Sequence, residues 1–74
     1  MKMRTADTIT WLQIRALRDA GDSATKRDCE AILSESRGHD TPRDLYDAAG
    51  DMPGIGSDIS SGLDRLVLSL ARLQ

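Results

Sequence analysis

The 74-residue chain contains a single cysteine, Cys29, and a single histidine, His39. One thiol cannot form an internal disulfide framework or a cysteine-rich zinc site. No apolar run approaches the roughly 18 residues needed to span a bilayer. Polar residues follow Lys2 and Arg4, where a signal peptide needs an apolar stretch. We therefore expect a cytoplasmic protein that makes no contact with a membrane.

Aromatic residues are also scarce, because the chain has only Trp11, Tyr46 and no phenylalanine. A chain this short buries only about 60% of the surface that its unfolded form exposes, so its core must be small. Apolar residues make up 39% and charged residues 30%, which is typical of a folded, soluble chain. We expect residues 1–74 to form a single domain. Trp11 is either the main anchor of its core or, if exposed, a binding hot spot.

Charge is divided unevenly between the two halves of the chain. Residues 1–37 carry seven basic and six acidic groups, whereas residues 38–74 carry three basic and six acidic groups, a net charge of −3. Ten of the twelve acidic residues are aspartates, which favour helix caps and turns over helix interiors. This composition predicts several short, capped helices.

Helix start and stop signals predict four helices, and no stretch alternates apolar and polar residues as a strand would. The predicted starts are Thr5 or Asp7, Ser23 or Thr25, Thr41, and about Ser57. The predicted ends are Gly21, Gly38, Gly50 and Leu73. Ile9 falls within the first helix, Thr25 and Asp28 resemble a capping box, and Pro42 suits the first turn of the third helix. The expected fold is all-α, a small compact bundle of four short helices.

The last predicted helix has the most regular apolar stripe in the chain. Its members are Ile59, Leu63, Leu66, Val67, Leu70 and Leu73. Leu68 and Ala71 widen the stripe beyond one face. This helix is either central and buried nearly all round, or it leaves an uncovered surface, including Leu66, Leu70 and Leu73, for a protein partner or a second copy.

The segment between the last two predicted helices has a distinctive composition, Met52-Pro53-Gly54-Ile55-Gly56. The proline prevents the preceding helix from continuing, and the two glycines allow a tight turn and close backbone contact. We expect Ile55 to point inward as the plug of this turn. Free N–H groups at the start of the following helix would then form an anion site.

This segment resembles the helix-hairpin-helix motif over about residues 41–68. The motif is apolar-Pro-Gly-apolar-Gly, followed after two variable residues by an apolar and a small residue, and after two more by an apolar residue. The matching positions here are Met52, Pro53, Gly54, Ile55, Gly56, Ile59, Ser60 and Leu63.

The resemblance implies non-specific contact with a DNA backbone, in which hairpin amides hold a phosphate. Those amides would belong to Gly54, Gly56 and Ser57, and charge would come from Arg43 and Arg65. The alternative is a purely structural turn between two helices. Nearby acidic residues favour that alternative because they repel phosphate: Asp47, Asp51 and Asp58.

Other chemistry-bearing residues give weaker indications. A basic cluster is either a backbone contact or a solvated face: Arg15, Arg18, Lys26 and Arg27. His39 is expected in a surface loop, and Cys29 as a small buried apolar group. The spacing of four aspartates does not match the alternating oxygen ligands of a calcium-binding loop: Asp44, Asp47, Asp51 and Asp58.

No nucleophile–base pair or metal cluster stands out in the sequence, so we expect no enzymatic activity, no cofactor and no metal site. The sequence indicates a small binding protein that contacts a nucleic-acid backbone through the hairpin. The alternative is a protein–protein interaction module, such as a small regulator or inhibitor of the phage or plasmid type. It would act through the acidic C-terminal half or the leucine-rich last helix, either as a single chain or as a homodimer.

Overall fold

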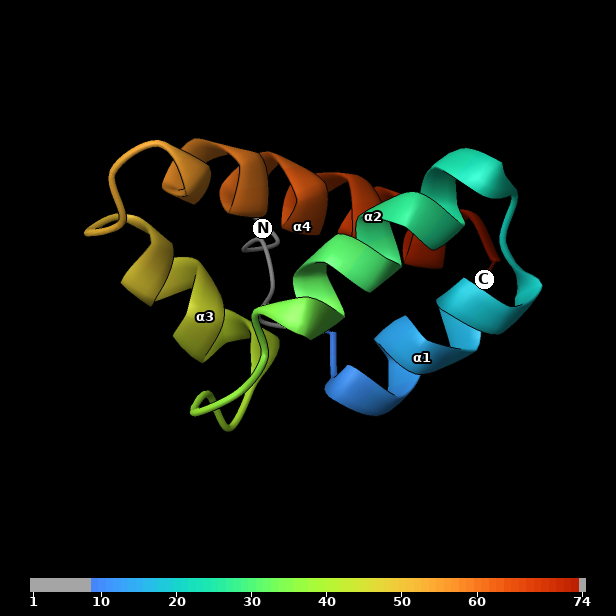
Figure 1. Cartoon of the computed structure of the whole chain (residues 1–74). Coiled ribbons are helices and arrows are strands. Elements are labelled where there is room, and N and C mark those ends of the chain that lie inside the picture. Colours follow the sequence, from blue (N-terminus) through green and yellow to red (C-terminus); the bar gives the residue numbers. More distant parts are fainter. Residues whose placement is uncertain (1–8, 74) are drawn as a thin grey trace, which may run out of the picture.

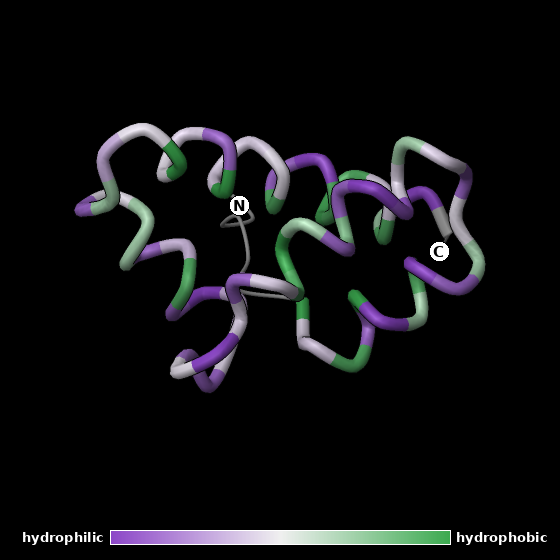
Figure 2. The backbone as a smooth tube through the Cα atoms, in the orientation of Figure 1, coloured by the Kyte–Doolittle hydropathy of each residue, from purple (hydrophilic) through white to green (hydrophobic). Residues whose placement is uncertain are grey.

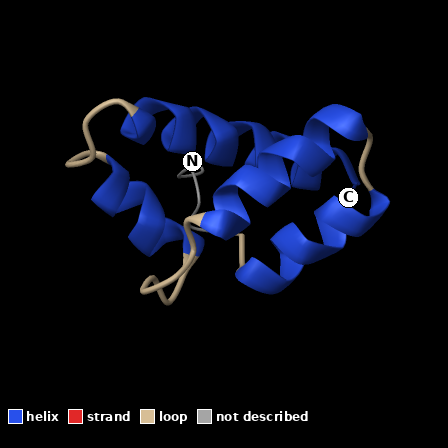
Figure 3. Cartoon of the chain, in the orientation of Figure 1, coloured by secondary structure: helices blue, strands red, loops and turns tan. Residues whose placement is uncertain are grey.

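The computed structural model describes residues 9–73 of the backbone and the side chains of residues 9–72. Within this range the chain forms four helices: α1 (Trp11–Ala20), α2 (Ser23–Ser34), α3 (Pro42–Ala49) and α4 (Ile55–Leu73). The described backbone contains helices and loops only (Figures 1 and 3). The expected all-α bundle of four helices is confirmed.

The start of α1 differs from the prediction. Thr5 and Asp7 lie outside the described residues, and the helix begins at Trp11 with Thr10 as its N-cap. The Gln13 amide donates to Thr10 Oγ1 at 3.2 Å, and the Thr10 amide donates to Gln13 Oε1 at 2.9 Å, which is a capping box. Ile9 is therefore not helical. It is buried immediately before the cap, in the position of a hydrophobic staple to the buried Ile14.

The predicted start of α2 near Ser23 is confirmed, but its cap is Asp22. Asp22 Oδ1 accepts a 2.9 Å bond from the Thr25 amide, so the proposed capping box of Thr25 and Asp28 is wrong. The helix ends at Ser34, before the predicted stop at Gly38. Gly38 instead lies in the loop before α3 with φ of +84°, a conformation that favours glycine.

The prediction for α3 is confirmed at both ends. Thr41 Oγ1 accepts a bond from the Asp44 amide at 3.1 Å, Pro42 occupies the first turn, and Gly50 follows the last residue. Gly50 keeps a right-handed conformation with φ of −61°, so it does not form the left-handed cap that glycine often provides.

The core lies between α4 and the other three helices, each of which contacts it, and α1 and α2 also pack closely against each other. Ten apolar residues are buried: Ile9, Ile14, Leu17, Cys29, Ile32, Leu45, Ala49, Ile59, Leu63 and Leu66. Hydrophobic and hydrophilic residues alternate along α4, as a helix with one buried face requires (Figure 2). Leu68 is 58% exposed, so α4 is not buried all round.

None of the described helices is both long and apolar enough to cross a membrane.

The Asp22 cap makes a testable contribution to stability. Bonds from Thr25 to its carboxylate lower the pKa of Asp22 below the usual value of 3.8. The ionised cap therefore stabilises the fold above that value, and the contribution is lost as the pH falls through the lowered pKa. Asp22→Asn retains a good N-cap without the charge. As the pH falls from about 5 to about 2, the urea midpoint of the wild type should decrease more than the urea midpoint of this variant. Parallel pH profiles of the two proteins would contradict this role.

Candidate functional site

The turn between α3 and α4 is closely packed at one glycine and left-handed at another. Gly54 has φ of +80°, which L-residues rarely adopt. Gly56 is buried, and a Cβ atom there would overlap the carbonyl oxygen of Ala49, the last residue of α3. The two helices can therefore approach this closely only if residue 56 is glycine.

Not all the backbone amides of this turn are available to a ligand. The Gly56 N–H donates to Met52 O at 3.2 Å, and the Ile55 N–H donates to Pro53 O at 2.9 Å. The Gly56 amide, which the resemblance assigned to a phosphate, is thus already bonded inside the turn. Gly54 and Ser57 are exposed. The Ser57 N–H is among the first four of α4, which have no acceptor within their own helix.

Ile55 does not plug the turn as the sequence suggested. It is the first residue of α4, which begins two residues earlier than predicted, and it is 45% exposed. Gly56 and Ile59 take the buried positions instead. The hairpin therefore presents a large apolar side chain to solvent near its tip.

The surroundings of the hairpin are acidic. Residues 40–58 contain one arginine and five aspartates, which are Asp40, Asp44, Asp47, Asp51 and Asp58. All five are exposed. Asp44 and Asp58 lie in the first turns of α3 and α4, where a carboxylate is favourable to the helix dipole. The net charge of this segment is −4 at neutral pH, which repels a nucleic-acid backbone.

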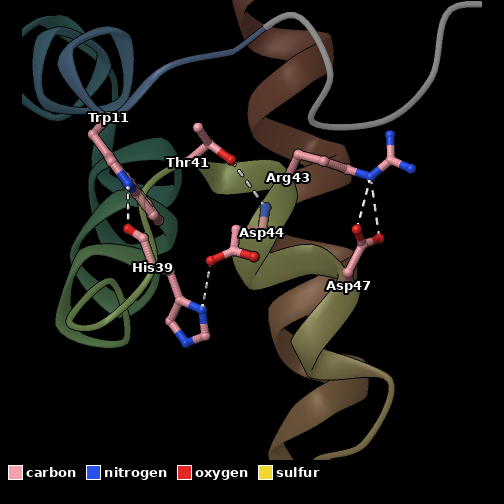
Figure 4. A network of polar contacts seen from close by, with 6 residues as sticks. All are labelled: Trp11, His39, Thr41, Arg43, Asp44 and Asp47. Carbon is pink, nitrogen blue, oxygen red and sulfur yellow. Dashed lines mark hydrogen bonds and ion pairs between the residues drawn. The ribbon is translucent and has the colours of Figure 1, made fainter.

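The two arginines predicted to bind phosphate are both paired with aspartates. Arg43 Nε lies 3.1 and 3.2 Å from the two carboxylate oxygens of Asp47, one turn along α3 (Figure 4). Arg65 donates through Nε and a terminal nitrogen to Asp28 of α2 at 2.8 and 3.0 Å. This bidentate pair raises the pKa of Arg65 and links α4 to α2.

The structure also does not bring these arginines to the loop. Arg43 lies in the first turn of α3, at the opposite end of that helix from the turn. Arg65 follows Ile55 by ten residues, which is about 15 Å along a helix. The predicted phosphate-binding set is therefore dispersed over the molecule, and only Gly54 and Ser57 remain exposed together.

A polar network that the sequence did not predict connects α1 to the start of α3 (Figure 4). Trp11 Nε1 donates to the backbone oxygen of His39 at 3.0 Å, and His39 Nδ1 lies 3.5 Å from Asp44 Oδ2. Trp11 is half-buried and packs against the edge of the core. It anchors the loop before α3 and does not fill the centre of the bundle.

The remaining candidates offer little chemistry. Cys29 is fully buried, and burial raises the pKa of its thiol, so the reactive thiolate is disfavoured. Among the described residues, no three His, Cys, Asp or Glu side chains gather as a metal site would require. In the predicted basic cluster, Arg18 pairs with Asp19 at 3.5 Å, and Arg15, Lys26 and Arg27 are exposed.

The predicted protein interface on α4 needs correction. Leu66 is fully buried in the core and cannot contact a partner, and Leu70 is half-buried against the core. The side chain of Leu73 lies outside the described residues. Ile59, Leu63 and Leu66 share the face of α4 that is buried in the core. Leu68 lies off that face and is exposed, as is the smaller Ala71.

The close approach at Gly56 predicts a large difference between two glycine variants. Gly56→Ala places a Cβ against the Ala49 carbonyl and should reduce the free energy of unfolding by about 1–3 kcal/mol. Gly50→Ala is the matched control, because a Cβ there would lie 3.4 Å from Asp47 O in ordinary contact. The control should change stability by no more than about 0.5 kcal/mol. Urea unfolding measures both, and equal losses would contradict the packing described.

No protein-family model, curated protein or solved structure matches the chain. The hairpin itself exposes Ile55 in an aspartate-rich segment, and Arg43, at the far end of α3, is paired with Asp47.

Proposed function

We propose that this protein is a non-enzymatic binding protein whose α3–α4 hairpin docks on a protein partner with a basic surface. The observation that carries this proposal is the exposure of Ile55 within a segment of net charge −4. A large apolar side chain at the tip of a packed turn is suited to entering a pocket on a partner. Interface energy is commonly concentrated in a few such residues.

The carboxylates that flank Ile55 in the sequence would supply the electrostatic part of this recognition. Asp51 precedes it in the loop and Asp58 follows it by three residues in α4, and both are exposed. Complementary charge at the rim of an interface accelerates encounter and selects against partners of the same sign. The expected partner therefore carries an apolar pocket bordered by lysine or arginine.

Support for a binding role, as opposed to catalysis, comes from the state of the reactive side chains. Cys29 is buried with a raised thiol pKa. His39 faces Asp44, and its backbone oxygen accepts the Trp11 bond, so it acts as part of a structural loop.

Nucleic-acid contact is the second candidate, and the exposure of Gly54 and Ser57 beside the left-handed turn favours it. These two residues could offer backbone amides to one phosphate, in the manner that the helix-hairpin-helix resemblance implies. Affinity for nucleic acid comes largely from lysine and arginine, however, and the described hairpin is negatively charged. We therefore place this function second.

The protein-partner proposal predicts that capture of a partner from lysate depends on Ile55. Ile55→Ser should weaken capture by at least about tenfold, because it removes the apolar anchor. Leu12→Ser is the matched control, since Leu12 is 73% exposed on α1. Quantitative pull-down with both variants measures the effect, and salt should elute the partner. A partner captured equally by wild type and Ile55→Ser would contradict the proposal.

The nucleic-acid candidate is tested by amide NMR of the labelled protein with a short DNA duplex at low salt. Shifts at Gly54 and Ser57 that salt reverses would support it. Asp58→Asn should then strengthen binding, because it removes a carboxylate from the first turn of α4, whereas Asp64→Asn further along the helix should have less effect. A spectrum that does not change at the highest duplex concentration would reject this candidate.

A further inference from the structure

A second surface lies away from the hairpin, where the start of α2 meets the last turns of α4. An open groove of about 240 Å³ runs between them. Its α2 side is formed by Asp22, Ala24, Thr25 and Asp28, and its α4 side by Arg65, Leu68, Ser69 and Arg72. A smaller hollow adjoins it, sharing Thr25 and Ser69.

The charges of this groove are sorted by helix. Both acidic residues lie on the α2 side, Asp22 as the N-cap and Asp28 within the helix, and both basic residues, Arg65 and Arg72, belong to α4. The two helices run in opposite directions here, as Figure 1 shows. The pairing of Asp28 with Arg65 therefore places Asp22 toward the end of the groove where Arg72 lies. The result is an acidic row beside a basic row.

Between the Asp28–Arg65 pair at one end of the groove and Asp22 and Arg72 at the other, the groove is lined by one large apolar residue and several small ones. Leu68 is 58% exposed on the α4 side, and Ala24 is exposed on the α2 side. A leucine that stands out beside a row of short side chains leaves room for a leucine of the same kind approaching from outside.

We propose that this groove is the interface of a homodimer with twofold symmetry, in which each copy covers the groove of the other. A twofold axis along the groove, parallel to the two helices, places Asp22 over the partner copy's Arg72. The Asp28–Arg65 pair, which is bonded within each chain, then lies over the same pair of the partner copy in the reverse order. Each Leu68 then reaches the small residues on α2 of the other copy. An isologous interface must be complementary to itself, and this arrangement of rows meets that requirement.

The choice of a second copy over another partner rests on this self-complementarity. The groove carries two acids and two bases, so it has no net charge to select a partner of either sign. The hairpin, in contrast, is strongly acidic and would repel its own copy. The dimer surface and the hairpin are thus separate, and the failure of one proposal leaves the other untouched.

Sedimentation equilibrium of the whole chain tests the dimer. The apparent mass should rise from one chain toward two with concentration, giving a dissociation constant below about 1 mM. Leu68→Lys should weaken the dimer by at least about tenfold, because it places two like charges in the interface. Leu12→Lys, at the other exposed leucine, should leave it unchanged. Circular dichroism establishes that both variants are folded.

The charge rows have a separate test. Asp22→Asn keeps the cap of α2 and Arg72→Gln keeps a polar side chain without the charge, and each should weaken the dimer by a few-fold and reduce its salt sensitivity. A mass of one chain at all concentrations up to about 1 mM would overturn the proposal. A dimer that is weakened equally by Leu68→Lys and Leu12→Lys, or that is insensitive to both charge variants, would also overturn it.

Discussion

The burial of one face of α4 is the constraint on which the other helices depend. Ile59, Leu63 and Leu66 have almost no exposed surface, and α1, α2 and α3 all pack against α4. Gly62 belongs to the same face. A Cβ there would lie 3.2 Å from Ile32 Cδ1, so the glycine allows α2 to approach closely. Glycine is unfavourable inside a helix by about 1 kcal/mol relative to alanine, and the contact with α2 gives a structural reason for it. A chain with so small a core depends strongly on close packing along this one helix.

A helix that is buried on one face exposes its other side to solvent, and α4 does so in two different directions. Ile55 and Leu68 are thirteen residues apart, which corresponds to about 20 Å along the helix and to directions that differ by about 140°. Neither side chain is held by the core, since both are among the exposed large apolar residues. The acidic hairpin and the groove beside α2 therefore lie at separate ends of one rigid element. Occupation of one surface does not obstruct the other.

Local chemistry made most of the fold predictable, and the errors come from competing local signals as well as from contacts distant in sequence. Thr41, Pro42 and Gly50 delimit α3 as their capping preferences predicted. The segment before α1 offered three threonines and one aspartate as caps, and the spacing from Thr10 to Gln13 was the signal that identified the cap. Residue type alone did not reveal that Ile55 is exposed, because its direction depends on the left-handed turn at Gly54. The candidate site was less predictable still, since Arg65 pairs with a carboxylate 37 residues away.

The two proposed surfaces have a common consequence for affinity. If copies associate through the groove, the twofold axis runs beside the C-terminal half of α4, and each copy keeps its hairpin at the opposite end of that helix. The dimer would then display two acidic hairpins in a fixed relation. A partner that offers two basic sites at a matching distance would bind with an avidity well above that of one hairpin, because the second contact becomes intramolecular. Surface charge–charge contacts are individually weak, typically about 0–1 kcal/mol. Duplication is therefore a physically reasonable way for a chain of 74 residues to bind firmly with a small tip that has one apolar side chain and a few carboxylates.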